Sequence, residues 1–166
     1  APRLEGHGTH YKDLERCSYH DWFLSLEKAY ERLAARCESI FVMGQSMGGT
    51  LALKFASEKR EKLKGVILVN PALSIPSWES IESGVAPRYI NEGSPDIKAQ
   101  NVMEIAYPKV PVASIRELQK LMAETKGLLD RVTYPVMGFK SSTDHVVPPE
   151  NTDFIMRQIR SAFKYV

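Results

Sequence analysis

Five consecutive residues near the start of the chain combine a nucleophile with the glycines that could expose it. Gly44-Gln45-Ser46-Met47-Gly48 matches the pattern Gly-x-Ser-x-Gly. In this pattern a sharp turn from a strand into a helix presents the serine hydroxyl to a carbonyl carbon, and the next backbone N–H can bind the oxyanion that forms. Ser46 is therefore the candidate nucleophile, and Met47 is the candidate oxyanion donor at the substrate site.

Two alternative roles for these residues remain open. The segment could be a glycine-serine turn that only connects a strand to a helix, or a phosphate-binding loop at a helix N-terminus. Neither Gly-x-x-x-x-Gly-Lys nor Gly-x-Gly-x-x-Gly, the usual phosphate-loop patterns, occurs in the chain. The nucleophile is favoured because of the segments on either side of the motif.

The flanking segments have the composition that such a turn requires. Residues 39–43 are apolar and β-rich, and residues 50–56 have helical composition with small side chains. Two more buried strands are expected at residues 65–70 and 135–140. Strands that alternate with helical segments predict an α/β fold, with a mostly parallel sheet flanked by helices.

Two capping boxes and the spacing of apolar residues predict where three of the helices lie. Ser18 and Asp21 form a capping box before residues with helical spacing. Ser114 and Glu117 form a second box before a helix expected over residues 115–129, and the last helix is expected over residues 149–163.

The segment between the second and third strands breaks this alternation. Residues 74–111 contain five prolines and no sustained apolar period, which indicates a cap or lid inserted over the sheet. The expected organisation is thus a core part at residues 1–73 that carries the serine motif, a cap at residues 74–111, and a second core part at residues 112–166.

Three motifs, taken in order, resemble those of the α/β-hydrolase superfamily. They are residues 2–10 (Pro-Arg-Leu-Glu-Gly-His-Gly-Thr-His), residues 44–49 and residues 144–149 (Asp-His-Val-Val-Pro-Pro). Together they look like the branch of bacterial carboxylesterases and monoacylglycerol lipases. The resemblance covers nearly the whole chain. It implies a partial α/β-hydrolase fold and a serine hydrolase that cleaves carboxylic esters through an acyl-enzyme.

The resemblance also implies a catalytic acid and a histidine, which follow the serine in chain order. Asp144 comes after the third strand and matches the acid, whose carboxylate would orient the imidazole. The second core part is thus expected to carry the acid. The rival position for an acid, at the end of the second strand, holds Asn70, which is not acidic. Alternatively, Asp144 only caps the turn before Pro148. No residue matches the histidine, since adjacent side chains such as those of Asp144 and His145 rarely point at one another.

The other three histidines have less direct roles. We expect His7 and His10 to shape the rim of the site and His20 to be solvated in the first turn of a helix. In the family the catalytic histidine follows a further strand, and a second oxyanion donor belongs to a loop after an earlier strand. We therefore expect residues 1–166 to be a fragment that is nearly inactive alone, because losing the base costs on the order of 10⁶ in kcat.

The cap supplies the candidate substrate contacts. Its larger apolar residues could line an acyl pocket or pack in the core; they are Ile75, Trp78, Ile81, Val85, Ile90, Ile97 and Val102. Ile75 is the candidate acyl contact among them. The resemblance suggests that Glu104 binds glycerol hydroxyls, although a solvated glutamate on a helix surface accounts for it equally well. The expected substrate is a small-molecule ester or a monoacylglycerol.

Composition excludes several other functions. The 166 residues are 43% hydrophobic and 25% charged with a net charge of +2, so a nucleic-acid partner is not expected. No apolar run is long enough for an integral membrane segment, and a cytoplasmic location is expected. No metal or organic cofactor is implied. Cys17 and Cys37 lie on either side of the first long helix, too far apart for a disulfide, and are expected to be free thiols.

Two rival functions use the same scaffold. A hydrolase fold that has lost its histidine could be a non-catalytic binding protein. An enzyme that keeps the nucleophile could instead be an acyltransferase that passes the acyl group to an acceptor other than water.

Overall fold

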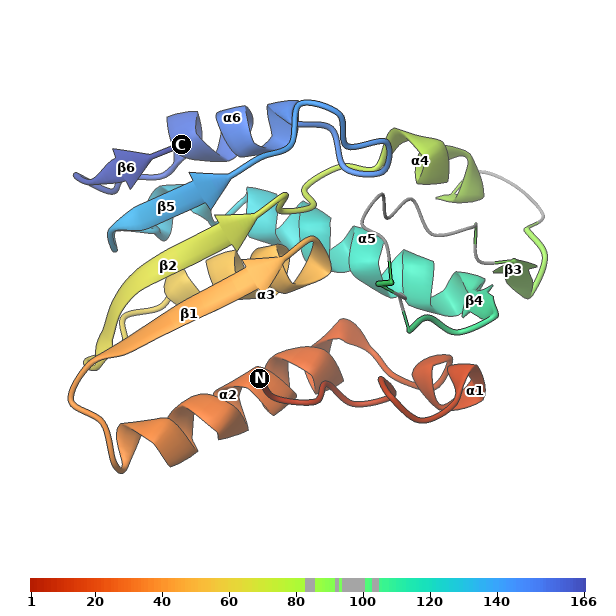
Figure 1. The fold of residues 1–166 in the computed structure, drawn as a ribbon, viewed down its shortest axis with the longest axis horizontal. Helices are drawn as coiled ribbons and strands as arrows, with labels where there is room; N and C mark the ends of the chain where they lie inside the picture. The colour runs from red at the N-terminus through yellow and green to blue at the C-terminus, as the bar shows by residue number, and fades with distance from the viewer. Residues whose placement is uncertain (83–85, 92, 94–100, 103–104) are drawn as a thin grey trace.

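A four-stranded parallel sheet forms the centre of the molecule (Figure 1). The computed structural model describes residues 1–82, 86–91, 93, 101–102 and 105–166. The strands lie in the order β1-β2-β5-β6, and each neighbouring pair is parallel. Their bounds are Ile40–Gln45 for β1, Leu63–Val69 for β2, Val136–Phe139 for β5 and Lys164–Tyr165 for β6. The expected mostly parallel sheet flanked by helices is confirmed.

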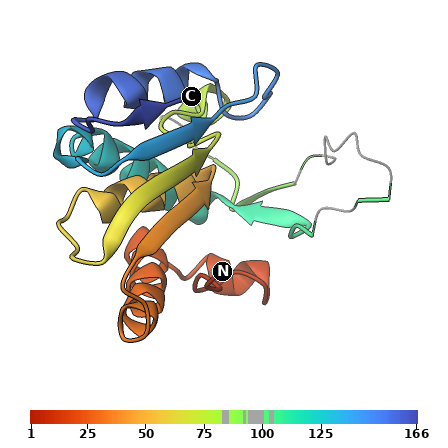
Figure 2. The same cartoon turned by 60° about the vertical axis from the view of Figure 1, so that its left-hand side comes forward.

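Helices pack on one face of this sheet and enclose the core (Figures 1 and 2). The longer helices are α2 (Tyr19–Ala34), α3 (Met47–Ala56), α5 (Val112–Lys126) and α6 (Glu150–Gln158). Two short helices are α1 (Tyr11–Leu14), before α2, and η1 (Leu129–Arg131), after α5. Trp22, Phe55 and Leu68, from α2, α3 and β2, are at most 1% exposed in the shared core. The capping box of α2 is confirmed, since the Ser18 N–H donates to Asp21 Oδ2 at 2.8 Å.

The start of α5 differs from the expectation. The helix begins at Val112, directly after Pro111, and Ser114 lies within its first turn. The Ser114 hydroxyl donates to the Leu14 carbonyl at 3.1 Å, while the Glu117 carboxylate accepts from the Tyr19 N–H. The predicted capping box of Ser114 and Glu117 is therefore wrong, because tertiary partners take both side chains.

The end of α6 also differs from the expectation. The helix ends at Gln158 rather than Phe163, and Ile159 is extended and buried. The Arg160 N–H donates to the Val132 carbonyl at 3.0 Å, and the Ser161 hydroxyl donates to the Phe163 carbonyl at 2.8 Å. These bonds turn the chain back to the sheet, where β6 pairs with β5.

The described residues between 74 and 111 lie beyond the carboxyl ends of β1, β2 and β5 (Figure 1). Their described parts are α4 (Pro76–Glu82) and two short strands, β3 (Tyr89–Asn91) and β4 (Lys109–Pro111). The two strands pair antiparallel and project away from the main sheet (Figure 2). Because ligands of open α/β sheets bind at the carboxyl ends of the strands, this segment lies on the functional side of the sheet.

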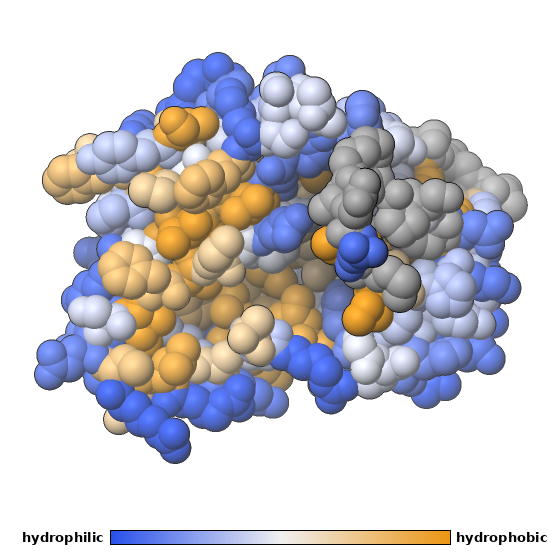
Figure 3. Space-filling view, in the orientation of Figure 1, coloured by the Kyte–Doolittle hydropathy of each residue, from blue (hydrophilic) through white to orange (hydrophobic). Residues whose placement is uncertain are grey.

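The face of the sheet opposite helices α2, α3, α5 and α6 is open and apolar (Figure 3). Phe41 and Met43 of β1 are 63% and 66% exposed, and Phe139 of β5 is 52% exposed. Parallel sheets are ordinarily covered on both faces, so this surface is unusual for a parallel sheet.

None of the helices in the described ranges is long and apolar enough to cross a membrane. Cys17 and Cys37 are free thiols, as expected.

Candidate active site

Ser46 occupies a strained turn between β1 and α3. It directly follows Gln45, the last residue of β1, and has φ +48° and ψ −119°, a conformation that a residue with a side chain rarely adopts. Its N–H donates to the Val69 carbonyl at 3.0 Å, and its carbonyl accepts from the Ala72 N–H at 3.1 Å. The end of β2 therefore holds the turn from both sides of the serine, and strain of this kind is typical of functional sites.

Two glycines make room for the turn, and only one of them is a fixed position of the Gly-x-Ser-x-Gly pattern. A Cβ on Gly44 would lie 2.0 Å from the Gly48 carbonyl oxygen, and a Cβ on Gly49 would lie 2.8 Å from Pro71 Cβ. A Cβ on Gly48 would meet no atom within 4 Å. The close approach of strand and helix thus depends on Gly44 and Gly49.

Met47 is the first residue of α3. The N–H groups at a helix start have no acceptor within the helix, and the helix dipole adds positive potential there. In α3 the first N–H groups that bond to the Ser46 carbonyl are those of Gly49 and Thr50. The N–H of Met47 precedes them at the start of the helix.

A charged cluster fixes the other end of α3. Lys54, which is 8% exposed, forms an ion pair with Glu124 of α5 at 2.5 Å, and the Tyr19 hydroxyl donates to the same carboxylate at 2.5 Å. The hydrogen bond from Lys54 lowers the pKa of Glu124, while burial raises the pKa of Tyr19 to about 12. The cluster joins α2, α3 and α5, so the helix behind the serine is anchored to two neighbours.

Asp144 is held by three hydrogen bonds in the loop after β5. Its Oδ1 accepts from the N–H groups of Val146 and Val147, both at 2.8 Å, and its Oδ2 accepts from Asn70 Nδ2 at 2.6 Å. Asp144 therefore does cap the turn before Pro148, and the same bonds fix the direction of its carboxylate. The two roles are compatible.

Asn70 is a site residue whose part the sequence did not reveal. It follows Val69, the last residue of β2, and has φ +42°, which asparagine tolerates better than most residues. The register aligns Gln45 with Val69 and Val69 with Phe139, so the ends of β1, β2 and β5 form one row. The available signal was the position of Asn70 at the end of the strand between the serine and the aspartate.

Three histidines are held by local contacts. His7 Nδ1 lies 3.2 Å from the Glu5 carbonyl, and its ring packs edge to face against Trp22 at 5.8 Å. His10 accepts from the Lys12 N–H at 3.2 Å and caps α1. His20 is exposed and stacks on the Tyr19 ring at 4.0 Å. His145 is exposed in the turn that follows Asp144.

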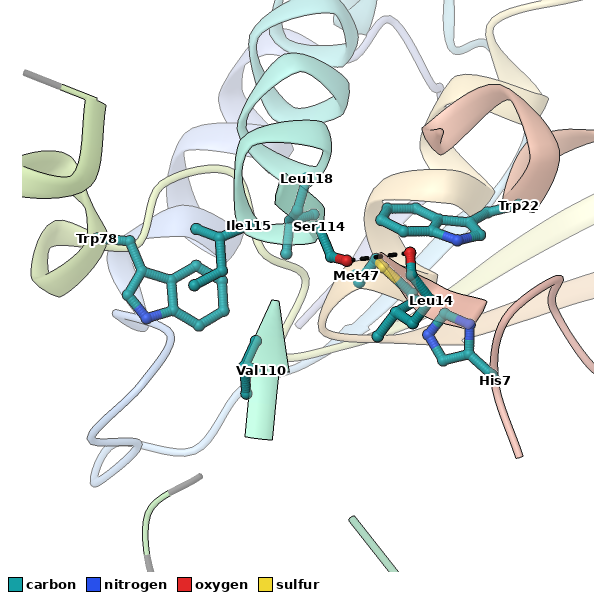
Figure 4. Close-up of a pocket in the computed structure, with 9 residues that line it drawn as sticks. All are labelled: His7, Leu14, Trp22, Met47, Trp78, Val110, Ser114, Ile115 and Leu118. Carbon is teal, nitrogen blue, oxygen red and sulfur yellow. Dashed lines mark hydrogen bonds between the residues drawn. The ribbon is translucent and has the colours of Figure 1, made fainter. Parts of the chain in front are cut away.

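A pocket of about 120 Å³ adjoins the serine turn (Figure 4). Apolar and aromatic side chains make up most of its lining, which consists of His7, Leu14, Trp22, Met47, Trp78, Val110, Ser114, Ile115 and Leu118. Met47 links the pocket to the serine turn, since it is the residue that follows Ser46. Small-molecule sites are commonly apolar hollows of this kind with a few polar groups.

The expected substrate contacts lie in different surroundings in the structure. Trp78 lines the pocket, whereas Ile75 is 3% exposed and belongs to the hydrophobic core. Ile90 is half-buried in β3, and Val102 is 54% exposed. Glu104, Val85 and Ile97 lie outside the described residues.

A parallel sheet whose first strand ends in a strained serine turn, backed by a helix N-terminus, defines the class of α/β-hydrolases. Residues 4–166 match the family described as serine aminopeptidase, S33, and the chain belongs to this family.

The chain is similar to lipases and esterases over nearly all of its length. It is 46% identical to the thermostable monoacylglycerol lipase of Bacillus sp. (strain H-257) over 99% of its length, and 28% identical to a carboxylesterase of Bacillus subtilis (strain 168) over 97%. A solved structure from work on the metagenome-derived lipolytic enzymes LipS and LipT superposes with a TM-score of 0.91 at 36% identity, covering 98% of this chain and 68% of that one. The resemblance to the carboxylesterase and monoacylglycerol lipase branch is confirmed. The chain spans 66% of the length of each of the two Bacillus relatives.

Proposed function

We propose that the intact protein is a serine hydrolase that cleaves carboxylic esters, acting as a carboxylesterase or monoacylglycerol lipase through an acyl-enzyme. The observation that carries this proposal is the strained turn at Ser46 between β1 and α3. A turn of this shape exposes the hydroxyl at the end of the sheet and places a free helix N-terminus beside it. The pocket next to Met47 offers an apolar surface for the acyl chain.

In the first half-reaction the general base removes the proton of the Ser46 hydroxyl while Ser46 Oγ attacks the ester carbonyl carbon. The Met47 N–H binds the oxygen as it gains negative charge, and the alcohol leaves with a proton supplied by the general base. In the second half-reaction water attacks the acyl-enzyme, which releases the carboxylic acid and restores the Ser46 hydroxyl.

The proposal gives Asp144 the role of orienting the general base. Its carboxylate would hold a histidine in the correct tautomer and stabilise the imidazolium formed during attack. Local contacts hold His7, His10 and His20, and the Bacillus relatives are longer than this chain. His145 is adjacent to Asp144 in the same turn, and adjacent side chains rarely point at one another. We therefore propose that the base is a histidine of the intact protein outside residues 1–166.

Ester hydrolysis by the intact protein tests the proposal. We expect release of p-nitrophenol from p-nitrophenyl esters and of fatty acid from a monoacylglycerol, and we expect Ser46→Ala to lower kcat by about 10⁶. Ser57→Ala is the matched control, because Ser57 caps the far end of α3, where its hydroxyl donates to the Lys54 carbonyl. No hydrolysis of any ester, or full activity of Ser46→Ala, would contradict the assignment.

A further inference from the structure

Two segments far apart in the chain contribute to the lining of the pocket beside the serine turn, together with residues of α2, α3 and α4. One wall comes from the loop and short helix before α2 and includes His7 and Leu14. Another part of the lining comes from β4 and the start of α5 and includes Val110 and Ser114. Figure 4 shows these side chains approaching from different elements. The width of the pocket therefore depends on what holds the two segments together.

A carboxylate joins the two segments next to the pocket. Glu15, directly after Leu14, accepts from Arg88 Nε at 2.7 Å and from Arg88 Nη2 at 2.9 Å, and also from the Tyr89 hydroxyl at 2.8 Å. The Glu15 side chain is only 16% exposed. A two-pronged arginine–carboxylate pair fixes both direction and distance, which an ordinary surface pair does not.

The paired strands β3 and β4 connect the Glu15 ion pair to the pocket lining. Tyr89 pairs with Pro111, the next pair of the same register is Ile90 with Val110, and the Val112 N–H donates to the Arg88 carbonyl at 3.1 Å. The position of Val110 is thus linked to Glu15 through backbone pairing and one ion pair.

Two further side chains join the same segments. The Tyr107 hydroxyl donates to the Gly6 carbonyl at 2.7 Å and accepts from the Thr9 N–H at 2.8 Å. The Ser114 hydroxyl donates to the Leu14 carbonyl at 3.1 Å, as drawn in Figure 4. These are uncharged hydrogen bonds, whereas the Glu15 pair is charge-assisted and two-pronged, although the Arg88 side chain is 72% exposed.

We propose that Glu15 is a positioning residue that sets the width of the acyl pocket and thereby the preference of the enzyme for acyl-chain length. This inference rests on the proposed esterase function. When the two walls are held together, a chain that fills the pocket contacts both, whereas an acetyl group does not reach them. If the walls are held together for only part of the time, the apparent affinity for a long chain falls by that fraction.

The test measures kcat and KM of the intact protein and of Glu15→Gln for p-nitrophenyl acetate, butyrate and octanoate. Glutamine keeps the size of the side chain but removes its charge. We expect KM for the octanoate to rise about three- to tenfold, with kcat for every ester and KM for the acetate within about twofold of the unaltered protein. Arg88→Met should give the same dependence on chain length, and the double variant should be little worse than either single one, since both remove one interaction.

Glu27→Gln is the matched control, because Glu27 pairs with Arg60 at 2.9 Å on a part of α2 that does not line the pocket. It should leave KM unchanged for all three esters. A Glu15→Gln variant that shows the unaltered KM for octanoate, or an equal change for all esters, would overturn the inference and leave the esterase assignment intact. Failure of the unaltered protein to hydrolyse any ester would instead remove the proposed function.

Discussion

Asn70 Nδ2 donates a hydrogen bond to Asp144 Oδ2 at 2.6 Å, which joins the end of β2 to the loop after β5. The other oxygen of Asp144 is held by two backbone N–H groups of its own turn. The carboxylate is thus fixed on both sides. Under the proposed function, Asn70 is the residue that aims the Asp144 carboxylate toward the row of strand ends where Ser46 lies.

Replacing Asn70 by alanine should lower kcat for ester hydrolysis by about tenfold with little change in KM, because the acid loses one of its three donors while the pocket is untouched. Steady-state kinetics on the intact protein measures this effect. Asn151→Ala is the control: Asn151 is buried and forms its side-chain hydrogen bonds with Ser74 rather than with Asp144. Equal losses of kcat in the two variants would indicate a general structural role for Asn70.

Alanine at Gly44 and alanine at Gly48 should have opposite consequences. At Gly44 the new Cβ would lie 2.0 Å from a backbone oxygen, so the strand and helix must separate, and we expect loss of activity and a fall in melting temperature. At Gly48 the Cβ meets no atom within 4 Å, and alanine gains up to about 1 kcal/mol of helix propensity. Thermal melting and ester hydrolysis of both variants measure the difference, and a destabilised Gly48→Ala would show that the turn is tighter than the structure has it.

The backbone strain at Ser46 should lower the free energy of unfolding, and glycine at this position should relieve it. Ser46→Ala and Ser46→Gly both remove the hydroxyl, but only glycine adopts φ +48° without steric cost. We expect Ser46→Gly to be more stable than Ser46→Ala by about 1 kcal/mol, since strain of one to a few kcal/mol is partly offset by the entropy of glycine in the unfolded chain. Chemical denaturation of the two inactive variants checks this, and equal stability would mean that the turn is relaxed.

The ion pair of Glu15 with Arg88 should contribute to the free energy of unfolding only above a certain pH. The hydrogen bond from Arg88 lowers the pKa of Glu15 from 4.5 to about 2. A carboxylate with a lowered pKa in the folded state stabilises the protein fully above its unfolded pKa, and this stability is lost as the pH falls toward the folded pKa. The difference in unfolding free energy between the unaltered protein and Glu15→Gln should thus be constant at neutral pH and shrink between pH 4.5 and about 2. A difference that does not depend on pH in this window would show that Glu15 is not the titrating partner.

The sequence predicted those parts of the fold that local pattern determines. The strand before Ser46, the helix after it and the capped start of α2 followed from apolar runs, helical composition and a capping box, because short-range physics decides them. The capping box at Ser114 failed, since the helix begins directly after Pro111 and distant partners took the side chains. The strand at Lys164–Tyr165 was also missed, because two exposed residues that pair with β5 carry no pattern of their own.

The candidate site shows the same division. Ser46 and Met47 could be named because the motif is contiguous, and Asp144 because the resemblance supplied it. Asn70 and Glu15 gained their roles from partners 74 and 73 residues away, Asp144 and Arg88, which no local pattern encodes. Ile75 shows the converse, since an apolar residue in a cap segment packs in the core as readily as in a pocket.

The most direct test of the central claim is labelling of the intact protein with a fluorophosphonate, followed by peptide mass spectrometry. If Ser46 is the activated nucleophile, one adduct should form on the peptide that contains Ser46, Ser46→Ala should abolish it, and Asp144→Asn should slow it strongly because the general base loses its orienting carboxylate. A protein that hydrolyses esters but carries the adduct on another serine, or carries none, would contradict the account.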